Sequence, residues 1–227
     1  MEVLGFDGVR VDPGAAATRL RVSDRGLVER LIDSVQEAMA PAAAFRVCYI
    51  DEKRDDGVIL DGISFTSRVL RRNLENVGRV FPFVLTAGRG VDELIAASGE
   101  MLEKYLLDEI GNMVLREARG RFERELRSRF ALETISCMAP GSLAEWPIEE
   151  QAPLFRLLPG VEAAVGVRLT KSFLMLPRKS ISGIYFPSEA TFFSCQLCPR
   201  ERCEGRKARF DLEKAREYGI AVNKERS

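Results

Sequence analysis

Three of the chain's five cysteines lie close together near the C-terminus, in the stretch FFSCQLCPRERCEGRK. Two residues separate Cys195 from Cys198, and four more precede Cys203, so a single loop can bring the three sulfurs to one centre. In a reducing compartment such a cluster binds a metal more often than it forms disulfides. The stretch therefore predicts a thiolate-ligated metal site, an iron–sulfur cluster or zinc, with free reduced thiols as the alternative.

The surroundings of these thiols suit a thiolate-bound metal but offer no fourth local ligand. Five flanking basic residues would offset the negative charge of such a centre: Arg200, Arg202, Arg206, Lys207 and Arg209. Cys137 is the best distant candidate for a fourth ligand, because Cys48 lies in an apolar stretch typical of a core strand. The metal ligands predicted from the sequence are thus Cys195, Cys198, Cys203 and Cys137.

The chain contains no histidine, which removes several kinds of chemistry. Ser-His-Asp and Cys-His catalysis, histidine-based zinc sites and the usual general base at neutral pH are excluded. Basic and acidic residues balance at 34 each, so we expect neither nucleic acid nor an anionic membrane as a partner. The N-terminus lacks a signal-like apolar segment and no run reaches about 18 apolar residues, so we expect a cytoplasmic protein.

The elements that must position the cysteines are a mixture of helices and strands. Apolar residues recur every four positions from Ser98 to Phe130, which predicts one long helix. A shorter amphipathic helix is expected over residues 23–40, with Ser23 or Asp24 as its cap. Further helices are expected over residues 64–78, capped by Ser64 or Thr66, and over residues 148–166.

Extended segments separate these helices without a regular βαβ order. Strands and turns are expected over residues 45–62, 79–90, 132–142 and 167–186. The predicted fold class is therefore α+β. We expect a single domain with a mainly antiparallel sheet flanked by helices, one long central helix and a Cys-rich C-terminal loop.

Two weaker motifs are candidates for anion binding or for catalysis. Gly88 and Gly90 lie at a strand-to-helix junction, where backbone amides can cradle an anion, although a plain tight turn is the commoner use. Glu145, Glu149 and Glu150 lie near the only tryptophan, but acidic residues in a first helical turn are ordinary partners of the helix dipole. Neither motif assigns a catalytic residue.

A longer pattern spans residues 139–186, APGSLAEWPIEEQAPLFRLL followed by GVRLTKSFLMLPRKSISGIYF. With its Pro-Gly turn and its Leu-Thr-x-Ser-Phe, Met-x-Pro and Ser-x-Ser-Gly-x-Tyr-Phe segments, it resembles the activation domain of cobalamin-dependent methionine synthase, particularly its free-standing members. The matching residues are Pro140, Gly141, Gly166, Leu169, Thr170, Ser172, Phe173, Met175, Pro177, Ser180, Ser182, Gly183, Tyr185 and Phe186. A looser likeness in FVLTAG and YLLDEIGNMVLREA suggests an activation-domain-like domain over residues 1–190 and a Cys-rich extension packed on it over residues 191–227.

The resemblance implies a role in returning oxidised cobalamin to its active form, by one-electron reduction and methylation from S-adenosylmethionine. The family's Arg-x-Ala-Pro-Gly-Tyr motif falls on residues 137–142, so the implied cofactor-binding residues are Ala139, Pro140, Gly141 and Ser142. Cys137 and Ser142 stand where the motif has arginine and tyrosine, which predicts weakened S-adenosylmethionine binding. Because no histidine is present to ligate cobalt, the cobalamin must belong to a partner, a corrinoid-binding protein or a cobalamin-dependent methyltransferase.

Residues and resemblance together give one leading hypothesis and two alternatives. The leading one is an accessory protein that docks on a corrinoid protein and supports its reductive reactivation, through a Cys-ligated iron–sulfur centre, as a redox partner of the methyltransferase. The first alternative is a non-catalytic corrinoid-protein-binding module with a structural zinc site. The second is a reactivation partner of methionine synthase that binds S-adenosylmethionine.

Overall fold

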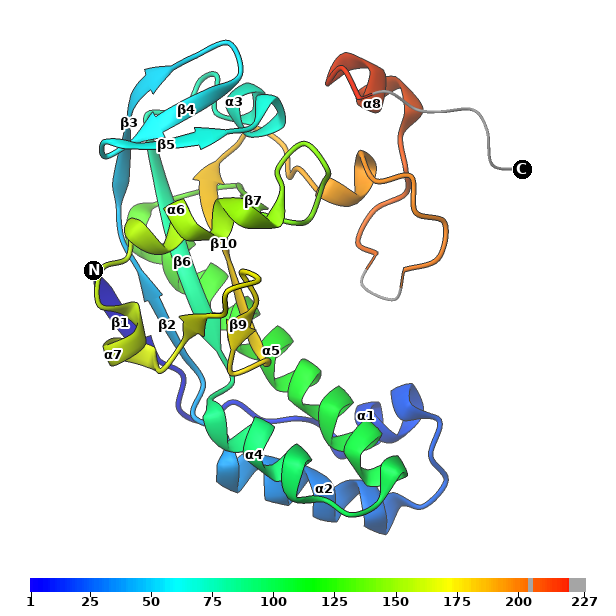
Figure 1. Ribbon diagram of the computed structural model, residues 1–227. Coiled ribbons are helices and arrows are strands. Elements are labelled where there is room, and N and C mark those ends of the chain that lie inside the picture. The colour runs from blue at the N-terminus through cyan, green and yellow to red at the C-terminus, as the bar shows by residue number, and fades with distance from the viewer. Residues whose placement is uncertain (204–205, 221–227) are drawn as a thin grey trace. The chain divides into compact units, whose positions relative to one another are not determined.

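The computed structural model describes residues 1–203 and 206–220 and has an α+β fold, as the sequence predicts. The helices are α1 (Pro13–Leu20), α2 (Arg25–Ala38), α3 (Arg68–Asn73), α4 (Arg89–Ala97), α5 (Met101–Phe130), α6 (Gln151–Arg156), α7 (Val161–Val165) and α8 (Leu212–Glu217), with 3-10 turns η1 (Ile148–Glu150) and η2 (Ser194–Gln196). The strands are β1 (Glu2–Gly5), β2 (Ala42–Phe45), β3 (Cys48–Lys53), β4 (Gly57–Leu60), β5 (Ile63–Thr66), β6 (Arg79–Thr86), β7 (Ile135–Met138), β8 (Arg168–Leu169), β9 (Met175–Leu176) and β10 (Ser180–Pro187). Figure 1 shows these elements along the chain.

The sheet combines hairpins between consecutive strands with pairings between strands that are far apart in the chain. Six of them run β1-β2-β6-β3-β4-β5, while β10 pairs with both β6 and β7, and β8 and β9 form a separate hairpin. The pairings of β2 with β1 and β6, of β3 with β4, of β4 with β5 and of β7 with β10 are all antiparallel. The predicted mainly antiparallel sheet is therefore confirmed.

The chain divides into two compact units, each built from three separated segments. Unit 1 comprises Met1–Phe45, Phe83–Ala131 and Leu158–Ser182. Unit 2 comprises residues 46–82 and 132–157 together with the described residues from Gly183 onward. Two of the dividing points fall inside strands, one in β6 and one in β10, so each of these two strands contributes residues to both units.

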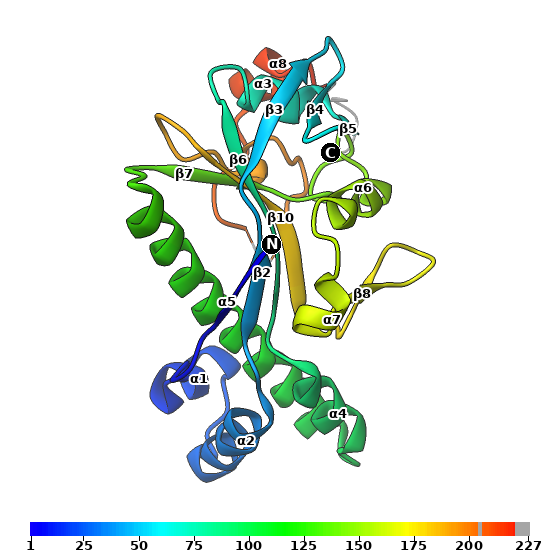
Figure 2. The ribbon, with the colours of Figure 1, turned by 90° about the vertical axis from the view of Figure 1, so that its left-hand side faces the viewer.

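Unit 1 buries the apolar face of the long helix. α1, α2, α4 and α5 contact one another, and Figure 2 shows them gathered together. The Phe122 ring packs against Phe45 and Phe83, with ring centroids 5.6 and 5.4 Å away. The buried positions of α5 recur at the helical spacing expected from the sequence: Leu106, Ile110, Val114, Ala118, Phe122 and Leu126. The long helix is thus confirmed, as is the Asp24 cap of α2, whose carboxylate accepts from the Leu27 N–H at 2.9 Å.

Unit 2 is built on the β3-β4-β5 meander and the β7–β10 pair. Cys48 is fully buried in its core, as predicted, and Trp146 is fully buried against the edge of the Phe65 ring. The C-terminal segment adds three side chains to the same core: Phe192, Leu197 and Ala215. The proposed boundary after residue 190 does not coincide with a dividing point of the units, since β10 and α8 belong to one continuous segment. It stays a prediction.

Two helix predictions are wrong in detail. Ser64 and Thr66 lie in strand β5 rather than at a helix start, and the cap of α3 is Ser67, whose hydroxyl accepts from the Leu70 N–H at 3.1 Å. Residues 148–166 do not form one helix, because the chain turns at Gly160 with φ +83° between α6 and α7. In the part of the chain that the structure describes, no helix combines the length and apolar character needed to cross a membrane.

Candidate functional site

The cysteine segment begins as a tight backbone turn in unit 2. The Gln196, Leu197 and Cys198 N–H groups donate to carbonyls three residues earlier, at 2.9, 3.0 and 3.3 Å. The last of these bonds joins the Cys198 N–H to the Cys195 carbonyl, so the two cysteines are the first and last residues of one turn. Leu197 between them is 1% exposed and anchors the turn in the core of unit 2.

Arg206 and α8 hold this turn in place. The Arg206 guanidinium donates to the carbonyls of Cys195 and Ala208, both at 3.2 Å, and of Cys198 at 3.4 Å. It also donates to the Arg200 carbonyl. Gln196 is tied to α8, since its carbonyl accepts from the Asp211 N–H and its side chain accepts from Lys214 Nζ, both at 2.9 Å. The sequence suggested charge compensation for Arg206, but not that one guanidinium would organise the loop.

The three clustered thiols do not converge on a common point in this arrangement. Cys195 and Cys198 are partly exposed and Cys203 is exposed. The Lys207 N–H donates to Cys195 Sγ at 3.4 Å. Among the described residues, no group of three or more cysteine, aspartate or glutamate side chains is arranged to hold a metal ion.

Cys137 lies on β7, where side chains alternate between the two faces of the sheet. Its neighbour Ser136 accepts from the Phe192 N–H at 2.7 Å, and Met138 belongs to the same core cluster as Leu197. Both neighbours therefore face the C-terminal segment, and alternation directs Cys137 to the opposite face of the strand. Its place as a fourth ligand to the clustered thiols stays a prediction.

The Ala-Pro-Gly-Ser turn follows β7 directly. Gly141 adopts φ +79°, a backbone conformation that favours glycine, and a Cβ there would lie 2.9 Å from Ile148 Cδ1, the end of a side chain that can shift. The Gly141 N–H donates to the Trp146 carbonyl at 2.7 Å and the Ser142 N–H to the Ala139 carbonyl at 3.1 Å. The turn therefore uses these backbone donors to close on itself.

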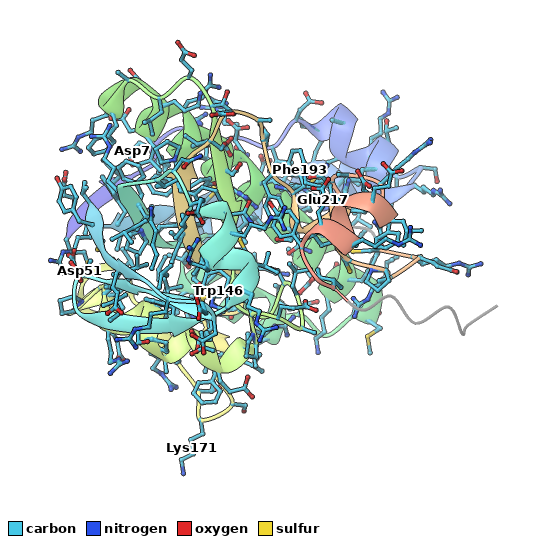
Figure 3. All side chains as sticks on the ribbon, turned by 90° about the horizontal axis from the view of Figure 1, so that it is seen from above. Asp7, Asp51, Trp146, Lys171, Phe193 and Glu217 are labelled. Carbon is cyan, nitrogen blue, oxygen red and sulfur yellow. The ribbon has the colours of Figure 1, made fainter. Side chains whose placement is uncertain are left out.

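The C-terminal segment contacts this turn. Ser142 Oγ lies 3.4 Å from the hydroxyl of Ser194, the residue that precedes Cys195. The predicted cofactor-binding turn and the predicted metal-binding loop are thus neighbours in unit 2, a proximity that the sequence does not reveal. Figure 3 labels Trp146, which closes the turn, and Phe193, which precedes Ser194.

The Gly88 and Gly90 turn in unit 1 is explained by close packing. A Cβ at Gly88 would lie 2.6 Å from the Ala40 N atom, and a Cβ at Gly90 would lie 2.3 Å from the Ala38 carbonyl oxygen. The Gly88 N–H is already bonded to Thr86 Oγ1 at 3.0 Å. Both glycines therefore allow the start of α4 to approach the end of α2.

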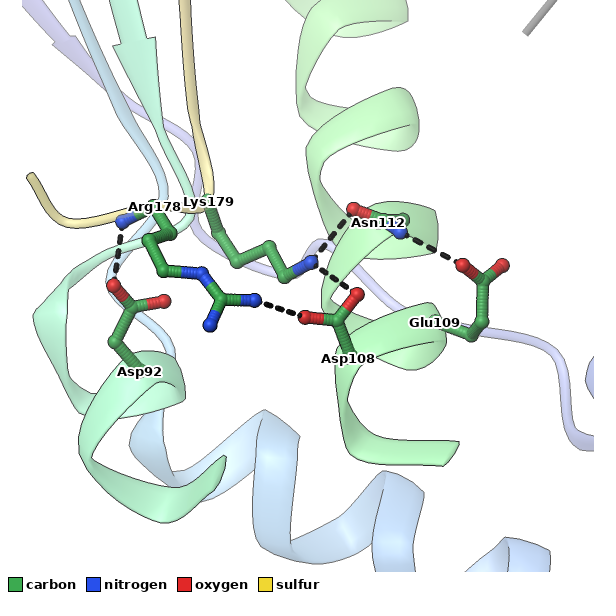
Figure 4. Close-up of polar contacts among 6 residues, drawn as sticks. All are labelled: Asp92, Asp108, Glu109, Asn112, Arg178 and Lys179. Atoms are coloured by element: carbon green, nitrogen blue, oxygen red, sulfur yellow. Dashed lines mark hydrogen bonds and ion pairs between the residues drawn. The ribbon is translucent and has the colours of Figure 1, made fainter. Parts of the chain in front are cut away.

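A charged cluster in unit 1 was not identified from the sequence (Figure 4). Lys179 Nζ, on a side chain only 7% exposed, contacts Asp108 Oδ2 at 2.7 Å and Asn112 Oδ1 at 2.9 Å. Arg178 contacts the other Asp108 oxygen at 2.8 Å, and its backbone N–H donates to Asp92 at 2.5 Å. The cluster joins the segment before β10 to α4 and α5. Its charges neutralise one another, which suits a structural role.

Two titratable groups of unit 2 have shifted pKa values. Burial raises the pKa of Glu150, although the Thr66 N–H, which donates to its carboxylate at 3.2 Å, acts in the opposite direction. Burial, helped by the negative charge of Asp61, raises the pKa of Cys48 to about 12. Glu150 is held by a backbone contact and Cys48 is an unreactive core thiol, so neither is a candidate catalytic group.

Comparisons with known proteins found one family for the C-terminal part of the chain. Residues 124–210 match the profile of the family described as vitamin B12 dependent methionine synthase, activation domain. That range contains the Ala-Pro-Gly-Ser turn and all three clustered cysteines. By this match, residues 124–210 resemble the activation domain of vitamin B12 dependent methionine synthase.

One solved structure resembles most of the chain. It is a crystal structure of the MetH reactivation domain bound to AdoHcy, with a TM-score of 0.59 and 18% sequence identity. The likeness covers 81% of this chain and 70% of that one, and at this identity it concerns the fold. No curated protein matches the chain significantly.

Weak binding of S-adenosylmethionine at this turn stays a prediction. It rests on the resemblance, by which Cys137 and Ser142 stand where the family motif has arginine and tyrosine. Two N–H groups of the turn already donate to carbonyls, that of Gly141 to Trp146 and that of Ser142 to Ala139. We therefore assign no step of the chemistry to a ligand at this turn.

Proposed function

We propose that this protein docks on a corrinoid-binding protein, such as a cobalamin-dependent methyltransferase, and supports its reductive reactivation. The observation that carries the proposal is the family match over residues 124–210, which spans both the turn after β7 and the cysteine loop. The fold likeness to a reactivation domain supports the same role. The cobalamin belongs to the partner, because the chain has no histidine to ligate cobalt.

In this proposal the cysteine loop holds an iron–sulfur centre. Cys195, Cys198 and Cys203 would supply thiolates, and Cys137, or a ligand from outside the chain, would complete the set. Since the three thiols do not converge in the described arrangement, the loop must change conformation to take up a metal. Such a centre would supply single electrons at low potential, whereas zinc at the same thiolates would only brace the loop.

The test combines metal analysis with an assay of partner reduction. Protein purified without oxygen is analysed for iron, sulfide and zinc, and is then added to an oxidised corrinoid protein whose reduction is followed by absorption. Bound iron and sulfide with faster corrinoid reduction would support the electron-relay role. Cys198→Ser should abolish that acceleration, while Cys48→Val, which changes a core thiol, should keep it.

Two outcomes would change the assignment. Zinc near one per chain without iron would favour the corrinoid-protein-binding module with a structural metal. Absence of any complex with a corrinoid protein, measured by size-exclusion chromatography of the mixture, would refute the docking role itself.

The S-adenosylmethionine-binding alternative has one observation in its favour, since the similar MetH domain was crystallised with AdoHcy. It predicts heat of binding in calorimetry with S-adenosylmethionine at micromolar concentration. The closed turn and the missing arginine and tyrosine predict none. Micromolar binding would show that this chain uses other contacts for the same ligand.

A further inference from the structure

The cysteine turn has a geometry that suits a bond between two of its sulfurs better than a site for three. A four-residue turn closed by a hydrogen bond from its last to its first residue keeps their Cα atoms within about 7 Å. Disulfides span Cα separations of roughly 4.4–6.8 Å. The bond from the Cys198 N–H to the Cys195 carbonyl, at 3.3 Å, therefore places these two cysteines within disulfide reach without a change of backbone path.

The turn is fixed by contacts that involve no sulfur and no metal. Arg206 binds the carbonyls of both cysteines, at 3.2 and 3.4 Å. Leu197 is buried in the core, and Gln196 is bonded to Asp211 and Lys214 on the α8 side. The Cα atoms of Cys195 and Cys198 are consequently held together in the reduced protein, which lowers the entropy cost of joining their side chains.

The two cysteines are also partly exposed, and both are contacted by neighbouring residues of the loop. Cys195 and Cys198 are both partly exposed, unlike the buried Cys48. The Lys207 N–H donates to Cys195 Sγ, and the Arg206 guanidinium is bonded to the same turn. Thiol–disulfide exchange requires such access for the incoming disulfide.

We propose that Cys195 and Cys198 form a redox-active dithiol that a low-molecular-weight disulfide converts to an intramolecular disulfide. The Cys195 thiolate attacks one sulfur of the oxidant, which forms a mixed disulfide and releases one thiolate. The Cys198 thiolate then attacks Cys195 Sγ, which closes the protein disulfide and releases the second thiolate. The two protons lost by the protein thiols pass to the two released thiolates, so two protein thiols are oxidised and one small disulfide is reduced to two thiols.

This dithiol would control the metal site of the proposed function without depending on it. A Cys195–Cys198 bond removes two of the three clustered ligands, so the disulfide and a bound metal exclude each other. The corrinoid-docking role does not require these thiols. A failure of the disulfide would therefore leave the docking experiment unaffected, and a failure of docking would leave the disulfide intact.

The test uses the full chain, freed of metal with a chelator and equilibrated with reduced and oxidised glutathione in varying ratio. Samples are quenched with acid, unfolded in denaturant so that buried Cys48 also reacts, alkylated and weighed by intact mass spectrometry. The alkylatable thiols should fall from the five of the sequence to three, without a glutathione adduct, and peptide mapping should join Cys195 to Cys198. Five thiols persisting under the most oxidising ratio, or a bond to another cysteine, would overturn the proposal.

Matched serine variants separate this pair from the other thiols. Cys203→Ser, at an exposed position, should still lose two thiols, and loss of the reaction in this variant would overturn the pairing. Cys198→Ser should instead retain one glutathione on Cys195, because the resolving thiol is absent. Far-UV circular dichroism confirms that each variant is folded, and the wild-type peptide map decides the pairing even if Cys198→Ser is not.

Discussion

Replacing Lys179 by methionine should destabilise the protein measurably. Methionine keeps most of the aliphatic length but removes the ammonium group that contacts Asp108 and Asn112 at 2.7 and 2.9 Å. Breaking a buried ion pair by removing one partner costs about 3–5 kcal/mol. Here Asp108 retains Arg178 at 2.8 Å and its side chain is 28% exposed, so we expect the smaller cost of about 2–3 kcal/mol.

Thermal unfolding followed by far-UV circular dichroism measures this loss. For a chain of this length, about 2–3 kcal/mol corresponds to a fall in Tm of roughly 4–12 °C. The control is Lys171→Met, since Lys171 points outward from the β8–β9 hairpin (Figure 3) and its loss should change stability by less than about 0.5 kcal/mol. A double-mutant cycle with Asp108→Asn should return a coupling energy of at least about 0.5 kcal/mol. An unchanged or higher Tm for Lys179→Met would refute the structural role of the cluster.

Three further predictions concern single side chains. Because burial raises the pKa of Glu150 above its ordinary 4.5, the stability that its protonated carboxyl contributes is complete below pH 4.5 and is lost as the pH rises through the higher folded-state pKa. Glu150→Gln should therefore gain stability relative to wild type between pH 4 and 7, as measured by urea titrations. A difference in stability that does not change with pH would contradict this prediction. Because the pKa of Cys48 is raised to about 12, the protein should lose stability as the pH rises from 9 toward 12, and Cys48→Val should not show this loss. The Cys48 thiol should also resist iodoacetamide in the folded protein. Gly88→Ala places a Cβ 2.6 Å from the Ala40 N atom at φ +97° and should cost at least about 2 kcal/mol, whereas Gly99→Ala, with open space around it, should be nearly neutral by the same thermal assay.

The fold was predictable where a single local pattern dominates. The four-residue repeat of apolar side chains sufficed for α5, and Asp24 acts as the α2 cap because its carboxylate reaches the third N–H beyond it. The helix start and its cap were predicted wrongly within residues 64–78, because Ser64, Thr66 and Ser67 can all cap a helix in the same way. Only the pairing of β5 with β4, a tertiary contact, decides between them.

The candidate site was less predictable because its geometry depends on distant partners. The cysteine spacing is compatible with a metal, but whether the sulfurs converge depends on Arg206, which binds the backbone carbonyls of the turn. The face that Cys137 presents follows from the packing of Ser136 and Met138 against the C-terminal segment. These are contacts between segments far apart in sequence, which residue spacing alone does not encode.

The interleaved composition of the two units has a consequence for how the protein is made. Unit 1 needs the segment that ends at Ser182, and unit 2 needs core residues that come later still, such as Leu197 and Ala215. A ribosome adds about 5–20 residues per second, so a growing chain holds the apolar face of α5 without its full set of partners for several seconds. Unit 1 has all its segments once Ser182 has been added, whereas unit 2 still waits for Leu197 and Ala215. Until Ser182 has been added, the apolar face of α5 is exposed to aggregation.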